Sequence, residues 1–211
     1  MKIALLNGSP KPGKSNSGIM LKRFENYLTG HDLTHYSLCK KLPTETEYAQ
    51  LFSANVWVFA FPLYIDAIPS HLFRVMVDIE ARITSEQAKN IRIYAIINNG
   101  FYEGSQNRVA VEILQNWSER VGLCFGMAIG QGAGEMMPFV ENVPTGYGPL
   151  KALGNAMQQL AEHIIKQEQT DALLFSPNLP WLAWNFTAVH GFWHVLAKKN
   201  GLKRKELFGK P

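Results

Sequence analysis

Hydroxyls, glycines and lysines are concentrated between Gly8 and Ser17, directly after the apolar run Ile3–Leu6. Gly8–Ser15 fits the pattern G-x-x-x-x-G-K-[ST], in which an apolar strand leads into a glycine-rich loop and then a helix. Backbone N–H groups at such a helix start face an anion, and the helix dipole adds to the attraction. The segment therefore predicts a phosphate-binding loop.

Two kinds of phosphate ligand fit this loop: a nucleoside triphosphate with magnesium, and a flavin phosphate. A triphosphate hydrolase also needs an acidic magnesium ligand, usually an Asp that closes a later apolar strand. The apolar runs Val56–Ala60 and Ile91–Ile97 are followed instead by Phe61–Ile65 and Asn98–Tyr102, which supply amides, proline and aromatic rings. Asp66 lies past the first of these segments and is a poor metal ligand. Because such surfaces suit a flat, uncharged, hydrogen-bonding ring, a flavin is favoured over a nucleotide.

Length and composition indicate one domain with an appendage. A chain of 211 residues is long enough to bury a substantial core. The net charge of +4 arises near the C-terminus, where residues 198–211 hold six Lys/Arg and one Glu, while the remaining residues hold 15 Lys/Arg and 16 Asp/Glu. A body without a broad basic face is not expected to bind nucleic acid.

Cysteine usage and the N-terminus indicate a reducing compartment. The two cysteines, Cys39 and Cys124, are too few for a disulfide framework or a four-cysteine metal site. Met1 and Lys2 lead directly into an apolar strand, without the apolar core of a signal peptide. We therefore expect a cytoplasmic protein without a bound metal.

Apolar runs alternate with segments of helical spacing along residues 1–170. The runs lack the polar alternation of half-exposed strands and so predict strands covered on both faces. Alternating strands and helices predict a parallel sheet with right-handed crossovers and helices on both faces. The expected strands are Ile3–Leu6, Leu33–Leu38, Val56–Ala60, Ile91–Ile97 and Phe125–Ile129, and the expected helices are Ile19–Leu28, Glu45–Phe52, Leu72–Ile83, Val109–Val121 and Leu153–Ile164.

The loops that follow four of these strands are rich in Gly, Asn, Pro, Tyr and Phe. They are Gly8–Ser17, Phe61–Ile68, Asn98–Gln106 and Gly130–Glu135. In open parallel sheets, ligands bind beyond the carboxyl ends of the strands. This edge of the sheet is therefore the expected functional site.

Three of these loops resemble the motifs of the flavodoxin-like NAD(P)H-dependent FMN reductase and quinone reductase superfamily. Asn7–Lys11 followed by Ser15–Ser17 looks like its G-S-P-[RK]…S-N-T phosphate loop. Pro62–Pro69 is similar to its P-L-Y-x-x-x-x-P flavin loop, and Asn98–Glu103 to its N-G-G-F/Y segment. The resemblance covers about residues 1–170. It implies an α/β fold with a flavodoxin-like, doubly wound, five-stranded parallel sheet of order 2-1-3-4-5.

The same resemblance implies the residues that bind FMN. The phosphate would be held by Ser9, Lys11, Ser15, Asn16 and Ser17. The ring would be lined on one side by Pro62, Leu63, Tyr64 and Ile65, and closed on the other by Asn99, Gly100, Phe101 and Tyr102. The cofactor itself performs the redox chemistry, so no catalytic acid, base or nucleophile is assigned.

The implied activity is an FMN-dependent NAD(P)H oxidoreductase that passes electrons to a small acceptor, such as a quinone, a nitro compound or free flavin. Flavodoxins that only carry electrons are usually strongly acidic near the flavin, whereas this body is nearly neutral. The enzyme is therefore favoured over a non-catalytic FMN electron carrier or redox module. A P-loop nucleotide binder is the third alternative.

Residues 171–211 are expected to form an aromatic helix and a basic tail, separate from an FMN-binding domain at 1–170. Ala172–Ala197 contains no charged Asp, Glu, Lys or Arg but is interrupted by prolines, asparagines and histidines, which argues against a transmembrane helix. From Pro180 onward, a polar stripe lies opposite an apolar face, as in an amphipathic helix. We expect it to pack on its own domain or across a homodimer interface, with contact to a membrane surface as the alternative. The stripe consists of Thr187, His190, Gly191, His194 and Lys198, and the apolar face of Leu182, Val189, Trp193 and Leu196.

Overall fold

The structure is a computed structural model that describes residues 1–39 and 41–208. The end of the expected basic tail, residues 209–211 with Lys210, lies outside the described residues. The chain divides into two compact units, Met1–Pro177 and a second unit that starts at Asn178. The boundary thus lies seven residues after the one expected from the sequence, because the first unit includes one more strand.

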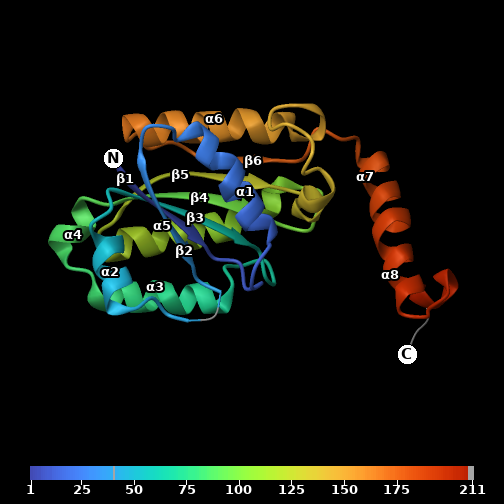
Figure 1. The fold of residues 1–211 in the computed structure, drawn as a ribbon, viewed down its shortest axis with the longest axis horizontal. Coiled ribbons are helices and arrows are strands. Elements are labelled where there is room, and N and C mark those ends of the chain that lie inside the picture. Colours follow the sequence, from blue (N-terminus) through green and yellow to red (C-terminus); the bar gives the residue numbers. More distant parts are fainter. Residues whose placement is uncertain (40, 209–211) are drawn as a thin grey trace. The chain divides into compact units, whose positions relative to one another are not determined.

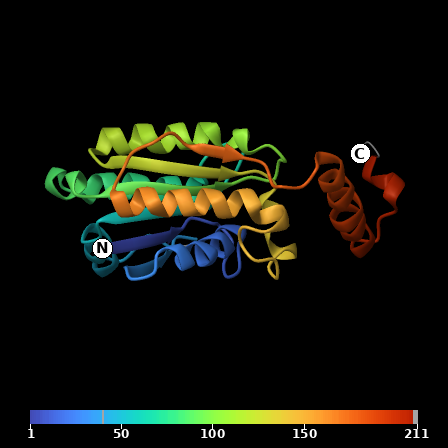
Figure 2. The ribbon, with the colours of Figure 1, turned by 90° about the horizontal axis from the view of Figure 1, so that it is seen from above.

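The first unit is built on a parallel sheet. Among the described residues the sheet has six strands in the order β2-β1-β3-β4-β5-β6. Every neighbouring pair is parallel, so the carboxyl ends of the strands meet at one edge, as the strand arrows in Figure 2 show. The strands are β1 (Lys2–Asn7), β2 (Asp32–Ser37), β3 (Val56–Pro62), β4 (Arg92–Asn98), β5 (Cys124–Gln131) and β6 (Leu173–Phe175).

Helices cover both faces of the sheet, as predicted (Figure 1). Helices α2 (Glu45–Phe52), α3 (Ser70–Arg82) and α5 (Arg108–Val121) bury their apolar sides on one face. Helices α1 (Asn16–Phe24) and α6 (Lys151–Lys166) do the same on the other. A short α4 (Ser85–Lys89), which the sequence did not predict, starts at a capping box formed by Thr84 and Gln87. Short 3-10 helices occupy Glu25–Tyr27, Gly104–Asn107, Gly134–Phe139 and Gly148–Leu150.

The prediction of five strands was wrong, because β6 adds a sixth beside β5. The order 2-1-3-4-5 is correct for the first five strands. β6 has three residues and pairs with Ile129–Gln131. So short a run carries no clear periodic signal, and it lies in the segment that the sequence assigned to the tail.

The chain that leads into β6 runs along β5. The Thr170 N–H donates to the Gly126 carbonyl at 3.0 Å. The Tyr94 hydroxyl, in β4, donates to the carbonyls of His163 and Glu168 at 2.9 and 3.2 Å, and burial raises its pKa to about 12. A Cβ at Gly126 would lie 2.5 Å from the Tyr94 ring, so this crossing requires glycine.

The second unit is one continuous helical segment followed by a short turn. Helix α7 (Trp181–Thr187) continues through a π-helical turn (Ala188–Trp193) into α8 (His194–Lys199). A 3-10 turn follows at Arg204–Phe208. Within the described range, no helix is both long enough and apolar enough to cross a membrane.

Candidate functional site

The loops after β1, β3, β4 and β5 form a cleft at the carboxyl edge of the sheet. Its volume is about 120 Å³, which is below the roughly 300–1,000 Å³ of typical ligand pockets. A cofactor-sized ligand would therefore extend beyond this volume or displace one wall. The cleft is lined by Ser9, Lys11, Asn16, Ser17, Pro62, Leu63, Tyr64, Asn98, Asn99, Gly100 and Glu135.

One end of the cleft is the loop that joins β1 to α1. The Ser9 N–H donates to Asn7 Oδ1 at 3.1 Å, and the Lys11 N–H donates to Ser9 Oγ at 3.3 Å, so local hydrogen bonds shape the loop. Ser15 Oγ caps α1 by accepting from the Gly18 N–H at 3.1 Å. The N–H groups of Asn16 and Ser17 belong to the first turn of the helix, which has no intrahelical acceptor for them. This end of the cleft thus combines free helix N–H groups, hydroxyls and a lysine, as a phosphate site requires.

The two lysines of this loop have different surroundings. Lys11 lines the cleft. Lys14, which the nucleotide P-loop pattern would place on a phosphate, forms an ion pair with Glu141 at 2.6 Å. The position of Lys14 therefore does not support the nucleotide alternative.

The end of β4 adds two buried amides to the cleft. Asn98 Nδ2 donates to Ser17 Oγ at 3.0 Å and to the Phe61 carbonyl at 3.2 Å, which ties β4 to α1 and β3. Asn99 Nδ2 donates to the Glu103 carbonyl at 3.2 Å, but Asn99 Oδ1 is buried and has no hydrogen-bond partner among the described residues. Buried polar atoms are rarely left without a partner. Asn99, which lines the cleft, therefore carries a buried acceptor that the described part of the chain leaves without a partner.

The β3 wall ends in a tight turn. The Leu63 N–H donates to the Asn98 carbonyl at 2.8 Å, which attaches the wall to β4. Tyr64 and Ala67 then exchange two backbone hydrogen bonds of 3.0 and 3.2 Å. The two residues between them, Ile65 and Asp66, have φ values of 50° and 59°, in the left-handed region that disfavours a β-branched residue. Ile65 is 99% exposed, so no burial compensates for this strain.

The walls after β4 and β5 are joined to each other by backbone contacts. The Gly134 N–H donates to the Asn99 carbonyl at 2.7 Å, and the Ala133 N–H donates to the Phe101 carbonyl. The Gly132 N–H donates to the Phe175 carbonyl of β6 at 2.9 Å. A Cβ at Gly132 would lie 2.0 Å from the Tyr102 carbonyl oxygen, so only glycine allows this approach. These contacts fix the position of the Asn99 wall.

A side chain of α1 holds the loop between β5 and α6. Arg23 Nη2 donates to the carbonyls of Val140 and Glu141 at 2.9 and 3.0 Å. Arg23 Nη1 donates to the Val143 carbonyl at 3.0 Å and to Thr145 Oγ1 at 2.9 Å. The position of this loop therefore depends on α1 as well as on the sheet.

The structure brings most of the predicted site residues together in this cleft. Ser15, Ile65, Phe101 and Tyr102 are not among its lining residues. Ser15 instead caps α1, and Ile65 is exposed in the tight turn. Phe101 is half exposed beside the cleft, and the Tyr102 carbonyl packs against Gly132.

Sequence reasoning missed two lining residues, Asn98 and Glu135. Asn98 could have been identified from its position at the end of the strand, next to Asn99. Glu135 closes the glycine-rich loop Gly130–Glu135, which was expected at this edge without a role for any single residue. Nearby, Gln131 at the end of β5 is 1% exposed, and neither polar atom of its amide has a hydrogen-bond partner among the described residues.

His71 lies beside the phosphate loop. Burial lowers the pKa of His71, and a hydrogen bond with the Gly8 backbone opposes this shift. Its Nε2 is buried without a hydrogen-bond partner in the described part of the chain. His71 is therefore disposed to remain neutral in the folded protein, and protonation at acidic pH opposes folding.

Larger grooves lie along the outer side of α1. One of about 710 Å³ is lined by Lys14, Lys22 and Glu141 among others, and it contains no residue of the β3 or β4 loops. It offers a shallow charged surface without converging buried amides. The smaller strand-edge cleft is therefore the better candidate site.

The fold is similar to those of solved flavoproteins. The apo form of an NADH:FMN oxidoreductase has a TM-score of 0.61 and 10% identity, over 87% of this chain and 98% of its own. An FMN-dependent NADH-azoreductase from Bacillus anthracis, solved in complex with FMN, has a TM-score of 0.58 and 17% identity, over 78% and 99%. A short-chain flavodoxin associated with a bacterial microcompartment has a TM-score of 0.57 and 13% identity, over 79% and 99%.

The sequence matches no protein-family model and no curated protein. At these identities the structural similarity establishes the fold. The chain has the flavodoxin-like fold found in NADH-dependent FMN oxidoreductases, with its candidate site at the carboxyl edge of the sheet.

Proposed function

We propose that this flavodoxin-like chain is an FMN-dependent oxidoreductase, which takes electrons from NADH or NADPH and passes them to a small acceptor such as a quinone, a nitro compound or free flavin. The observation that carries the proposal is the strand-edge cleft. It has the start of α1 with Ser9, Lys11 and Ser17 at one end and the unpartnered acceptor Asn99 Oδ1 at the other. This pairing of an anion site with a buried amide matches a phosphate-bearing, hydrogen-bonding ring.

The residues of the chain have separate tasks in this proposal. Lys11 and the first N–H groups of α1 neutralise the phosphate. Asn99 Oδ1 would accept a hydrogen bond from the ring, and Pro62 and Leu63 would exclude water from one side of it. When bound, FMN supplies the capacity to accept a hydride and release its electrons, so the protein needs no acid or base of its own.

Exposed aromatic side chains in the loops after β3 and β4 offer apolar surface for the two substrates. Tyr64 is 48% exposed and Phe101 is 52% exposed. Aromatic rings in such positions stack with flat partners. Nicotinamide and acceptor would bind there in turn, in contact with the ring. The identity of the acceptor, the homodimer and the cytoplasmic location stay predictions.

A non-catalytic FMN electron carrier is the second candidate. It is favoured by the similarity to a short-chain flavodoxin and by the carboxylate of Glu135 in the cleft. The near-neutral charge outside the C-terminal segment favours the enzyme. The two candidates differ in their electron donor, since a carrier receives electrons from a partner protein and not directly from a nicotinamide.

The test is the absorption spectrum followed by rapid mixing. We expect the purified protein, alone or after addition of FMN, to retain flavin bands on gel filtration. Stopped-flow mixing with NADH or NADPH should then bleach these bands with a rate that saturates with nicotinamide concentration. Reduction only by a protein donor would support the carrier. A protein that stays colourless and does not bind added FMN would refute both.

A matched pair of lysine variants tests the position of the phosphate. Lys11→Ala should weaken FMN binding by about tenfold, because it removes a charge-assisted hydrogen bond at the cleft. Lys14→Ala should change it less than twofold, since Lys14 is paired with Glu141. FMN titration followed by fluorescence measures both. The reverse order, with tight ATP binding lost in Lys14→Ala, would favour the P-loop alternative.

A further inference from the structure

The second unit exposes large apolar side chains along its whole helix. Over residues 181–196, all of them described, no side chain is fully buried. Large apolar side chains that are more than a third exposed include Trp181, Leu182, Phe186, Phe192, Trp193 and Leu196. A continuous apolar surface of this kind marks a contact site for a protein or a membrane.

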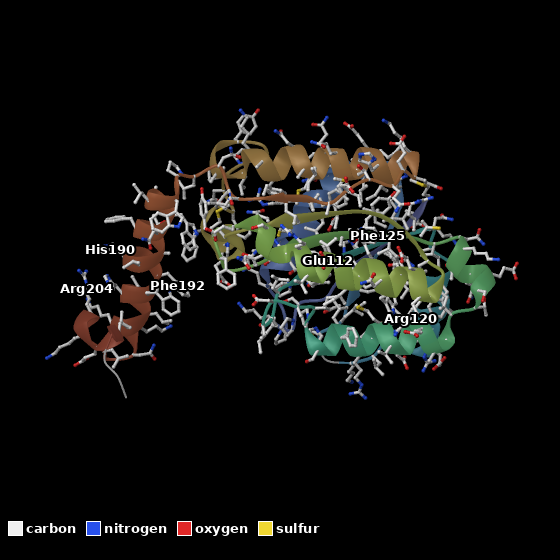
Figure 3. All side chains as sticks on the ribbon, turned by 180° about the vertical axis from the view of Figure 1, so that it is seen from behind. Glu112, Arg120, Phe125, His190, Phe192 and Arg204 are labelled. Carbon is white, nitrogen blue, oxygen red and sulfur yellow. The ribbon has the colours of Figure 1, made fainter. Side chains whose placement is uncertain are left out.

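These side chains occupy a wide part of the helix circumference. Leu182 and Phe186, four residues apart in α7, share one side of the helix. The π-helical turn Ala188–Trp193 then changes the register, so the exposed side chains that follow it spread around the axis. Figure 3 shows Phe192 and His190 pointing away from different sides of the helix. A helix that pairs with one other helix buries a narrower seam. The width of this face favours an extended, flat partner.

Positive charge is confined to the C-terminal end of the same helix. Between Ala172 and Lys205 the chain contains no Asp or Glu. Lys198 and Lys199 end α8, and Lys203 and Arg204 follow it. Desolvation lowers the pKa of His194 in α8, and the positive charge of Arg204 lowers it further. Arg204 therefore lies close to α8. Basic residues therefore lie beside the apolar face.

This charge distribution fits an anionic surface better than it fits a parallel pair of helices. Parallel pairing of two copies of the helix would bring the basic ends together, where like charges repel. An anionic lipid surface provides the opposite charge, and each Lys or Arg close to it adds to the attraction. Tryptophan is also enriched at the boundary between headgroups and acyl chains.

We propose that the second unit lies on the surface of an anionic membrane. Its apolar face enters the boundary between headgroups and acyl chains, and the basic residues from Lys198 to Arg204 contact the phosphate groups. An amphipathic helix binds in this way without spanning the bilayer. The proposal does not depend on the flavin site.

Vesicle sedimentation tests this proposal with the full chain. We expect the protein to sediment with vesicles of equal parts phosphatidylglycerol and phosphatidylcholine, and to remain in the supernatant with phosphatidylcholine alone. The bound fraction should fall as salt is raised from about 0.1 M to 1 M, because salt screens the charges. Tryptophan fluorescence should shift to shorter wavelength on binding, while the capacity for FMN should not change.

Matched variants locate the contact. Leu182→Glu/Trp193→Glu should weaken vesicle binding at least tenfold, whereas Val77→Glu/Ile165→Glu, which alters two similarly exposed apolar residues of the first unit, should not. Lys198→Glu/Lys199→Glu should abolish the preference for anionic lipid, and Lys89→Glu/Lys166→Glu should retain it.

Three results would overturn the proposal. One is equal sedimentation with neutral and anionic vesicles. Another is equal loss of binding in the first-unit variants. The third is a protein that ignores vesicles and is a dimer in light scattering, which Leu182→Glu/Trp193→Glu converts to a monomer. In that case a second copy of the chain covers the face.

Discussion

The two walls of the strand-edge cleft are held in different ways. The walls after β4 and β5 are joined by the backbone hydrogen bonds that Ala133 and Gly134 donate to the Phe101 and Asn99 carbonyls, and by an approach of Gly132 to Tyr102 that only glycine permits. The β3 wall is attached through the Leu63 N–H and then ends in an exposed turn with two residues at positive φ. If one wall moves to admit a cofactor, it is the β3 wall, which has fewer constraints. One wall thus sets the hydrogen-bonding geometry, and the other adapts to the ligand.

The largest expected effect comes from breaking the fixed wall. Gly132→Ala places a Cβ 2.0 Å from the Tyr102 carbonyl oxygen, so the loops after β4 and β5 must separate. We expect a loss of about 3 kcal/mol in the free energy of unfolding and of most FMN affinity. Urea denaturation and FMN titration measure the two effects. In Gly100→Ala the nearest contact of a Cβ, to Glu135 Cγ, is 3.8 Å, and wild-type stability is expected. Equal free energies of unfolding for Gly132→Ala and Gly100→Ala would contradict the inference that the close approach at Gly132 holds the walls after β4 and β5 together.

A smaller, opposite effect is expected at the adaptable wall. Ile65→Asn replaces a β-branched residue at φ 50° by one that tolerates the left-handed region. The variant should gain about 0.5–1 kcal/mol in the free energy of unfolding, because the exposed Ile65 side chain buries no apolar surface that the change would lose. Urea denaturation measures the gain.

The control for this variant is Ile165→Asn, which changes an exposed isoleucine in α6. It should not gain stability, since asparagine lowers helix propensity. If Ile65→Asn is destabilising instead, the turn is not strained and the β3 wall is more firmly held than we infer.

The smallest expected effect concerns the charge at the end of the fixed wall. Glu135 lines the cleft, so its carboxylate disfavours added negative charge on a bound ring. Glu135→Gln should raise the midpoint potential of bound FMN by about 10–20 mV, measured by spectroelectrochemistry. Glu103→Gln, in the same wall but not lining the cleft, should leave the potential unchanged. An equal shift in both variants would assign the effect to overall charge.

The sequence predicted the parts of the fold that have strong local signals. The buried strands are short apolar runs in the sequence because both of their faces are covered. The predicted bounds of α2 are those of the structure. The strand-end loops could be assigned to one edge because parallel strands end together. Ser9, Lys11 and Ser17 were assigned to the site because Asn7–Lys11 and Ser15–Ser17 resemble the phosphate loop of the FMN reductase superfamily.

Other features depend on contacts between distant residues and carry no local signal. The turn at Ile65 and Asp66 lacks the glycine or asparagine that usually marks positive φ. Glu135 reaches the cleft through a loop that Arg23 holds from α1, 117 or more residues earlier in the chain. β6 forms because its three residues pair with the end of β5 and the Gly132 N–H donates to the Phe175 carbonyl. Each depends on tertiary packing, which patterns within a short window do not contain.

The segment Glu168–Phe175 also bears on how the protein avoids associating through its sheet. β5 is apolar and would present a long row of unpaired N–H and C=O groups if it were the last strand, which invites pairing with strands of other molecules. The Thr170 N–H and the three residues of β6 cover that row and leave only a short, half-buried strand at the border. A chain shortened before Leu173 would therefore aggregate through β5, whereas one shortened after Pro177 keeps its border strand.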